Sequence, residues 1–458
     1  MGGRTEVTIG VDIGTTSVKA IAADGDGNVV ARSRVRHPIG IPAPDRLEHD
    51  VDRAWRRNVR RAYREAAEGL DVRAVNVAAM VPSLGAVDAR GRALTPGLLY
   101  GDERGRTGVG LDPASSGELL QFLRWLASEA PDAAGFWPAQ GVANHALCGE
   151  GVIDTVTAMT ALPLFTGVEW DAAVAADAGV RLDQLARIVA GSEPAGRVRG
   201  TDVLLGGGTI DAFGEQLVAG ADEVGDVLVI CGTTLITWAV TDEWRDVPGL
   251  WTIPHTTAGR ILLGGPSNAG GLFLNWAAGL LGRAARGRGP GGGAAGGTEG
   301  LDPHRIPVWL PYVRGERTPL HDPDRRAQLV DLDLTHGPAA ARRAAYEAAG
   351  FVVRHHLDLA GVPARRIVAT GGGTHSADWV QCLADATGLP VDVVAVPEGG
   401  ALGAAYLARV TAGLERSAAD SARWARTDRR VEPDPVWSAA MAERYDRFRA
   451  LTGGPGEG

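Results

Sequence analysis

An aspartate, a Gly-Thr-Thr turn and a lysine near the start of the chain have the types and spacing of an anion-binding site. Asp12 precedes Gly14, Thr15 and Thr16, and Lys19 closes the segment. Glycine lets the backbone turn tightly, and successive backbone N–H groups, helped by hydroxyls, can surround a phosphate oxyanion. A carboxylate just before the turn can hold Mg²⁺, usually through water. The alternative is an ordinary glycine-containing hairpin. The segment is not a Walker loop, because the G-x-x-x-x-G-K-[ST] spacing is absent.

A second Gly-Thr-Thr turn, Gly232-Thr233-Thr234, lies between apolar, β-rich runs later in the chain. The surroundings of the two turns are alike, because residues 11–24 and 224–242 both read as strand, turn and strand. The second turn alone is a weak signal, but two facing turns of this kind can clamp one polyphosphate. The repeated pattern indicates two similar halves, each opening with a phosphate-binding hairpin.

Three consecutive glycines, Gly206–Gly208, end an apolar strand pattern and are followed closely by Asp211. Glycines at a strand end expose backbone to a ligand. Asp211 begins the next helical pattern, where a carboxylate that projects into a cleft can accept the proton of an attacking hydroxyl. The alternative is that Asp211 only caps the helix.

A further glycine run, Gly371–Gly373, joins a strand to a helix and is followed by Ser376. Glycines at a strand–helix turn suit a flat ligand that lies close to the main chain, such as a nucleoside. No acidic residue follows at the spacing of a dinucleotide-binding unit, so the run does not indicate NAD.

Alternating strands and helices must position these motifs. The apolar pattern predicts strands at 6–14, 18–24, 29–37, 203–208 and on both sides of Gly232, and helices at 50–69, 115–130, 338–360, 376–387 and 434–451. This alternation indicates an α/β protein with sheets covered on both faces. We expect one domain over 1–220 and a second over 221–458, with a flexible Gly-rich insertion at about 285–300.

Composition narrows the class of protein. The 458 residues suffice for two or three domains, and the net charge of −9 argues against a nucleic-acid or membrane-surface partner. Three cysteines without metal or disulfide spacing, and no secretory pattern at the start, favour a cytoplasmic location. Lys19 is the only lysine among 46 Lys and Arg residues, which a genomic preference for arginine codons explains most simply.

The four motifs occur in the order of the FGGY carbohydrate kinases, members of the actin-like ATPase superfamily. VTIGVDIGTTSVKAIAAD resembles that family's first phosphate loop, VICGTTLITWAV its second, and GGGTIDAFGEQLVAG its catalytic-aspartate segment. VWLPYVRGERTPLHDPDRRAQLVDLDLTH is similar to the family's GERTP stretch, and TGGGTHSADWVQCLADATGLPV with PEGGALGAAYLA is similar to its adenosine segment. The resemblance covers nearly the whole chain, and the combined motifs are highly specific.

The resemblance implies two RNase-H-like domains flanking a catalytic cleft, with MgATP mainly on the second domain and a sugar mainly on the first. It implies that Asp211 is the catalytic base and that Asp12 is the carboxylate on the Mg²⁺ side. The residues that it implies at the nucleotide are Gly14, Thr15, Thr16, Lys19, Gly232, Thr233, Thr234, Gly372, Gly373 and Ser376.

The substrate loop departs from the family pattern. Where xylulose kinases of this family carry Gln-Met-His-Gly, this chain has Met80, Val81, Pro82 and Ser83. A proline ring, which cannot donate a hydrogen bond, therefore replaces a histidine that can, and this puts D-xylulose itself in question. Val81, Pro82 and Ser83 are the expected substrate-loop residues.

Asp102 and Arg104 sit where related kinases place a motif near the sugar, either as ligands of its hydroxyls or as a structural ion pair. Together the motifs predict an ATP- and Mg²⁺-dependent carbohydrate kinase that phosphorylates a hydroxyl of a small sugar. A ketopentose such as xylulose or ribulose, or a related polyol, is the expected acceptor. The alternatives are a catalytically silent, sugar-sensing pseudokinase and a chaperone-like ATPase of the same superfamily, and a homodimer is left open.

Overall fold

The structure, a computed structural model, describes residues 5–105, 118–189, 193–282, 287–288, 294–295 and 300–453. Contacts divide the chain into two compact units, the first of which comprises Met1–Val218 and Glu398–Trp424. The second comprises Ala219–Pro397 and Ala425–Gly458. The segment Glu398–Trp424, which the sequence analysis assigned to the second domain, therefore packs in the first unit.

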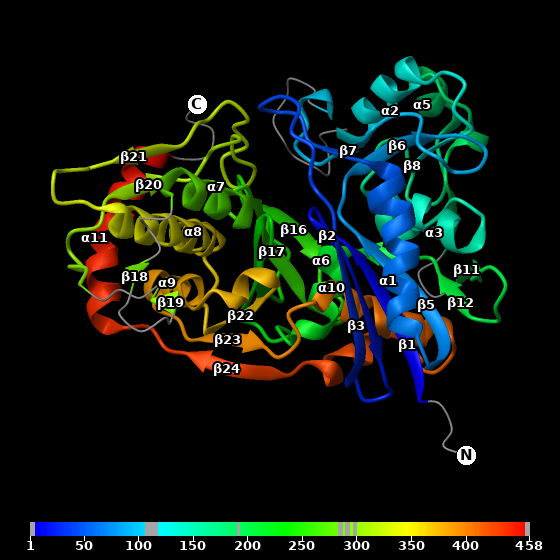
Figure 1. The fold of residues 1–458 in the computed structure, drawn as a ribbon. Coiled ribbons are helices and arrows are strands. Elements are labelled where there is room, and N and C mark those ends of the chain that lie inside the picture. Colours follow the sequence, from blue (N-terminus) through cyan, green and yellow to red (C-terminus); the bar gives the residue numbers. More distant parts are fainter. Residues whose placement is uncertain are drawn as a thin grey trace. The chain divides into compact units, whose positions relative to one another are not determined.

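A seven-stranded sheet forms the centre of the first unit (Figure 1). Its strands, in spatial order, are β11 (Pro194–Arg197), β12 (Leu204–Gly206), β5 (Asp71–Ala79), β1 (Glu6–Ile13), β2 (Ser17–Ala23) and β3 (Val29–Arg36), and β13 (Thr209–Ile210) also pairs with β5. β1, β2 and β3 form an antiparallel meander, whereas β5 runs parallel to β1, β12 and β13. The carboxyl ends of β1, β5 and β13 consequently lie at the same end of the sheet.

Helices pack on this sheet from both faces. They are the π-helical turn η1 (Asp52–Arg57) with α1 (Asn58–Ala67), and α10 (Gly399–Thr411), while α6 (Asp211–Ala219) follows β13 directly. In α1, Val59, Ala62 and Ala66 recur at helical spacing and are all buried, which explains why this segment forms a helix with one apolar side.

The alternation of side chains along β1 shows how one strand serves two layers. The odd-numbered residues of Val7–Ile13 are buried in a core shared with α1. Thr8 points to the other face, where its hydroxyl donates to the carbonyl of Ala405 in α10 at 2.8 Å. A Cβ on Gly10 would stand 1.8 Å from the carbonyl oxygen of Ala401, so only glycine lets α10 approach β1 so closely.

Insertions build a second layer of structure within the first unit. Its elements are a four-stranded sheet of β4 (Glu48–His49), β7 (Gly97–Leu99), β6 (Ser83–Val87) and β8 (Gly135–Trp137), the pair β9 (Val152–Asp154) and β10 (Arg187–Val189), the short η2 (Glu103–Gly105) and η3 (Leu182–Gln184), and helices α2 (Glu118–Glu129), α3 (Ala139–Cys148), α4 (Thr155–Met159) and α5 (Ala172–Asp177). The start of the predicted helix 115–130 lies outside the described residues, and α2 is its described part.

The second unit contains another seven-stranded sheet. Its strands, in spatial order, are β16 (Trp251–Pro254), β17 (Ile261–Ser267), β15 (Leu235–Thr241), β14 (Asp226–Cys231), β22 (Arg366–Thr370), β23 (Val391–Val394) and β24 (Thr427–Val431). Its other elements are α7 (Gly271–Leu281), α8 (Pro338–Ala360), α9 (Ala377–Thr387), α11 (Pro435–Thr452), the short helix η5 (Gly372–His375) and the pair β20 (Val308–Leu310) and β21 (Gln328–Val330). A short pair, β18 (Gly287–Arg288) and β19 (Ala294–Ala295), falls in the Gly-rich stretch, the rest of which lies outside the described residues except Gly300.

The two sheets repeat one plan. In each, an antiparallel hairpin with a Gly-Thr-Thr turn leads into a third antiparallel strand, and a later strand pairs in parallel with the first strand of the hairpin. The α/β class predicted from the sequence is confirmed. None of the described helices combines the length and apolarity that crossing a membrane requires.

Candidate functional site

Asp12 and Lys19 lie side by side because β1 and β2 form a tight hairpin in which they are directly paired. Lys19 Nζ donates to Asp12 Oδ2 at 3.1 Å, and the charge of Asp12 raises the pKa of Lys19 above its ordinary value. The other oxygen of Asp12, Oδ1, is buried and has no hydrogen-bond partner among the described residues. A buried, unpartnered carboxylate oxygen fits a cation ligand, so this position suits Mg²⁺.

No larger metal site is present in the described part of the chain, where no three His, Cys, Asp or Glu side chains gather around one point. A Mg²⁺ ion held chiefly by one carboxylate, water and phosphate oxygens needs no such cluster. A Mg²⁺ site at Asp12 stays a prediction of the sequence.

Asp211 begins α6, and its backbone position follows from the two-residue strand β13, which pairs with the end of β5. Burial and the nearby charge of Asp12 raise the pKa of Asp211 to about 7. Asp211 Oδ1 accepts a hydrogen bond from the N–H of Ala212 at 2.7 Å. A carboxyl group with a pKa near neutrality is suited to acid–base chemistry, so this environment favours the predicted base over a mere helix cap.

The ends of β1, β5 and β13 place Asp12 and Asp211 at the same end of the first unit's sheet. Ile13 pairs with Ala79 in the register of β1 and β5, and Ala79 pairs with Ile210 in that of β5 and β13. Asp12 and Asp211 therefore leave the same end of the sheet, beside the loop at 80–83 that continues β5. Ligands of open α/β sheets bind at such carboxyl ends.

The glycine triplet before Asp211 is buried, which differs from the expectation that it exposes backbone to a ligand. A Cβ on Gly207 would stand 2.5 Å from a methyl group of Val189, and one on Gly208 only 1.9 Å from Nε2 of Gln140. Gly208 also has a φ of +115°. The glycines are needed because protein side chains, rather than a ligand, press on the turn.

The first Gly-Thr-Thr turn is held by residues that sequence reasoning missed. Thr15 Oγ1 and the hydroxyl of Tyr100 are 3.0 Å apart, and His49 Nε2 donates to the carbonyl of Thr15 at 2.7 Å. The Nδ1 atom of His49 accepts from the indole N–H of Trp55 at 3.0 Å, which fixes the neutral tautomer. Burial lowers the pKa of His49 to about 4 in agreement. Thr16, by contrast, is exposed and free to meet a ligand from solvent.

The loop at 80–83, which the sequence predicts to meet the substrate, leaves two apolar residues available. Val81 and Pro82 are half-buried, whereas Ser83 is buried, and its hydroxyl donates to the carbonyl of Met80 and accepts from the N–H of Ala139. The hydroxyl of Ser83 is thus used inside the protein, at the start of α3.

Asp102 and Arg104 form a buried ion pair. Arg104 Nη2 lies 2.7 Å from Asp102 Oδ2, and the same oxygen accepts from the N–H of Leu47 at 2.7 Å. Arg104 also pairs with Glu48 at 2.8 Å and lies over the ring of Trp125. Of the two interpretations that the sequence left open, this geometry favours the structural ion pair.

The second unit holds its own turn and glycine run. Thr233 and Thr234 are half-buried, and α7 begins against their turn, since the N–H groups of Gly271 and Leu272 donate to the carbonyls of Gly232 and Thr233 at 2.8 and 3.0 Å. The N–H of Gly232 is itself used within the hairpin, where it donates to the carbonyls of Ile230 and Thr234 at 3.0 Å. The Gly-Gly pair that opens α7 was not singled out from the sequence, although its spacing after a strand was a usable signal.

The glycine run of the second unit is partly open. A Cβ on Gly372 would meet nothing within 4 Å, whereas one on Gly373 would stand 2.2 Å from the ring of Trp379. The Ser376 hydroxyl accepts from the N–H of Trp379 and caps α9. Gly372 therefore presents accessible main chain beside a helix start, while Ser376 and Gly373 shape the turn.

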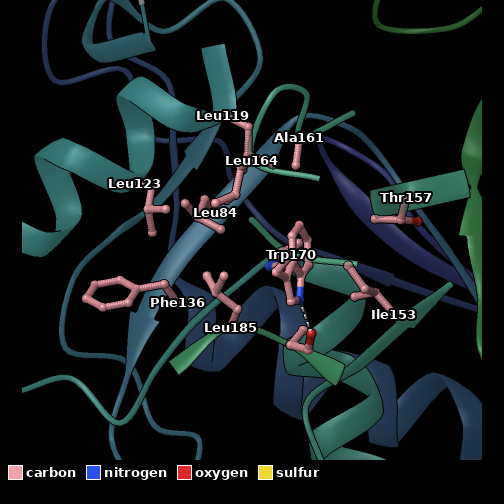
Figure 2. Close-up of a pocket in the computed structure, with 12 residues that line it drawn as sticks. Leu84, Leu119, Leu123, Phe136, Ile153, Thr157, Ala161, Leu164, Trp170 and Leu185 are labelled. Carbon is pink, nitrogen blue, oxygen red and sulfur yellow. Dashed lines mark hydrogen bonds between the residues drawn. The ribbon is translucent and has the colours of Figure 1, made fainter. Parts of the chain in front are cut away.

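A small cavity lies elsewhere, inside the insertion of the first unit (Figure 2). It has a volume of about 10 Å³ and a lining that is almost entirely apolar, including Leu84, Leu123, Phe136 and Leu164. Trp170 closes it with its indole N–H donating to the carbonyl of Ala186 at 2.8 Å. This volume is about that of a single water, so the cavity is a packing defect rather than a ligand site.

Segments of both units match known proteins. Residues 7–110 match the model of the N-terminal domain of the FGGY family of carbohydrate kinases, and residues 227–412 match that of its C-terminal domain. The chain is 27% identical to xylulose kinase of Escherichia coli (strain K12), over 97% of this chain and 98% of the relative. It is 25% identical to gluconokinase of Bacillus subtilis (strain 168), over 89% and 88% of the two chains.

A solved structure extends the similarity to three dimensions. Xylulose kinase from Rhodospirillum rubrum superposes with a TM-score of 0.72 at 27% identity, covering 97% of this chain and 98% of that chain. The relatives thus span the length of the chain but differ in the sugar named for them.

Proposed function

The chain belongs to the FGGY family of carbohydrate kinases, and we propose that it transfers the γ-phosphate of ATP to a hydroxyl of a ketopentose or a related polyol, with Asp211 as the base. The observation that carries the proposal is the half-buried carboxyl of Asp211, whose pKa is raised to about 7 and on which the charges of Asp12 and Lys19 act. A base with this pKa can accept the hydroxyl proton near neutral pH.

The other groups have electrostatic tasks in the proposed reaction. Asp12 would hold Mg²⁺ with the help of its unpartnered oxygen, and the ion would supply positive charge that neutralises phosphate oxygens. Lys19 and the backbone N–H groups of Thr15 and Thr16 would add positive potential on the first unit, and those of Thr233 and Thr234 would do so on the second, since the N–H groups of Gly14 and Gly232 donate within their own turns. The open main chain at Gly372 receives the adenosine.

The acceptor is argued from the loop at 81–83. Val81 and Pro82 offer apolar surface, and the hydroxyl of Ser83 is already used, so this loop supplies little polar recognition. The buried carboxylate of Asp102 and the guanidinium of Arg104 bind each other, which leaves them less available to sugar hydroxyls. An apolar loop of this kind, with Asp211 at the reacting hydroxyl, suits a small ketose or polyol.

The test is a coupled assay of ADP release with MgATP against a panel of ketoses, aldoses, polyols and sugar acids. We expect one ketopentose or polyol to stimulate turnover, and Asp211→Asn to reduce kcat by about 1,000-fold or more, because the proton acceptor is lost, with ATP binding retained.

The matched control is Asp171→Asn, at the N-cap of α5 in the same unit, which should keep full activity because asparagine also caps helices. Sugar binding without phosphoryl transfer in the unaltered protein would contradict the proposal and favour a sensor. Stimulation by a sugar acid alone would replace the proposed acceptor class.

A further inference from the structure

Two buried amide side chains on α3 contact the turn that precedes Asp211. Gln140 and Asn144 are four residues apart, so they share one side of the helix, and both are fully buried. Neither belongs to a motif that sequence analysis singled out. Buried amide groups must find hydrogen-bond partners, and here those partners include the turn before Asp211.

Gln140 joins Gly207–Thr209, the turn before Asp211 and here called the catalytic turn, to the central sheet of the first unit. Its Nε2 atom lies 3.2 Å from the carbonyl oxygens of both Thr209, in β13, and Val77, in β5. It lies 3.4 Å from Asp154 Oδ1, while Asp154 N–H donates to Gln140 Oε1 at the same distance. One side chain thus connects β13, β5 and the start of α4.

Asn144 repeats this arrangement one helical turn later. Its Nδ2 atom donates to the carbonyl of Val152 at 2.8 Å and to that of Gly207 at 3.2 Å. The two amides therefore hold the two carbonyls, of Gly207 and Thr209, that flank the positive-φ residue Gly208. Since a Cβ on Gly208 would overlap Gln140, the turn and the helix fit each other closely.

The same helix is anchored to the substrate loop. The N–H of Ala139, the first residue of α3, donates to the hydroxyl of Ser83 at 3.1 Å. α3 thus contacts the loop at 80–83 at its N-terminus and the turn before Asp211 along its side.

We propose that Gln140 and Asn144 are positioning residues that fix the turn at Gly207–Thr209 and thereby aim the carboxylate of Asp211. The inference rests on the proposed role of Asp211. Only Ile210 separates the held carbonyl of Thr209 from Asp211, so loss of these donors displaces the carboxylate directly. Misplacement of a catalytic group by about 1 Å can cost roughly 100-fold in rate.

The experiment compares Gln140→Met and Asn144→Leu, which remove the donors with little change in volume, with the milder Gln140→Asn. We expect kcat to fall by roughly 10- to 100-fold. The KM for ATP should stay within about threefold, because the inferred nucleotide contacts on the second unit are untouched. Amide hydrogen exchange in a peptide covering residues 207–212 should accelerate in the same variants.

The matched control is Gln184→Met. Gln184 is also buried in the first unit, where its Nε2 atom donates to the carbonyl of Ala133 at 2.7 Å, away from the catalytic turn. We expect it to lower Tm by a similar amount without changing kcat or the exchange of 207–212.

Unchanged exchange at 207–212 in all three α3 variants would overturn the inference, and so would faster exchange with an unchanged kcat. If Gln140→Met and Asn144→Leu prevent folding, the exchange and the kcat of Gln140→Asn test the inference instead. Hydrogen exchange needs no substrate, so a failure of the positioning role is distinguishable from a failure of the proposed kinase function, which would appear as an unaltered protein that phosphorylates no sugar.

Discussion

The ionisation of Asp211 links local environment to the pH dependence of the proposed reaction. Its pKa is raised to about 7, first by burial and then by the charge of Asp12, although Lys19 acts in the opposite direction. Only the deprotonated carboxylate can accept the hydroxyl proton. Activity should therefore be lost as pH falls through the raised pKa, rather than through the ordinary value of 3.8.

We predict that kcat/KM for the sugar falls about tenfold per pH unit below about pH 7, since that ratio reports groups of the free enzyme. Initial rates at low sugar concentration between pH 5 and 9 would measure it. The control is ATP binding by Asp211→Asn over the same pH range, and its affinity should show no such fall below about pH 7. A kcat/KM that begins to fall only below about pH 5 would contradict the raised pKa of Asp211.

Residue types and local spacing were enough to predict Asp12, Lys19, Asp211 and the two Gly-Thr-Thr turns as candidates. They were not enough to predict Gln140 and Asn144, which act on backbone carbonyls more than 60 positions away in the chain. A buried amide on a helix gives no signal in one sequence. Whether Asp102 and Arg104 bind a ligand or only each other could not be predicted from the sequence either. The answer depends on packing, because exposure decides whether a charged pair can bind a ligand.

At the scale of elements, glycines set how closely helices approach one another. α6 and α10 cross in the first unit, where a Cβ on Gly403 would stand 2.0 Å from the carbonyl oxygen of Gly214. Gly400, one turn earlier in α10, stands beside the carboxyl group of Asp12. The crossing therefore sets the spacing between the helix that begins with Asp211 and the strand that carries Asp12.

We predict that Gly403→Ala destabilises the protein by about 2 kcal/mol or more, because the added methyl group must push two backbones apart. Thermal unfolding followed by circular dichroism would measure the change. The matched control is Gly279→Ala in α7, where a Cβ meets nothing within 4 Å and alanine's helix propensity should add about 0.5 to 1 kcal/mol. Equal effects of the two substitutions would show that the close crossing does not limit stability.

Strands and helices were predictable where apolar periodicity is strong, as in β1, β2, α8 and α11. The strand pair of β16 and β17 and the helix α7 were not assigned from the sequence. The membership of α10 in the first unit could not be predicted either, because its sequence shows only an apolar helix. What places it there is complementarity with Gly10 and Thr8 of β1, a feature that exists only after folding.

At the scale of the whole molecule, the first unit is discontinuous in sequence. A fragment of residues 1–220 would lack α10, so the face of β1 and β5 that includes Thr8 and Gly10 would be open to water. Covering that face restores the burial that stabilises the sheet.

We predict that residues 1–220 alone unfold at lower denaturant concentration and bind more of a hydrophobic dye than residues 1–220 joined by a long Gly/Ser linker to 398–424. Urea titration of the two fragments would measure this difference. A scrambled version of the 398–424 segment on the same linker is the control and should give no stabilisation. Equal midpoints for the isolated and the joined fragment would refute the role of α10.

The same discontinuity gives the protein an order of assembly during synthesis. The whole of Ala219–Pro397 is translated between the two parts of the first unit, which at typical elongation rates takes roughly 10 to 40 s. During that interval the central sheet of the first unit, which includes Asp12 and ends just before Asp211, is on the ribosome with one face uncovered. The nascent chain should therefore depend on holding chaperones until residue 424 emerges, and the second unit, whose strands β14 to β23 precede α10, should begin to form before the first is complete.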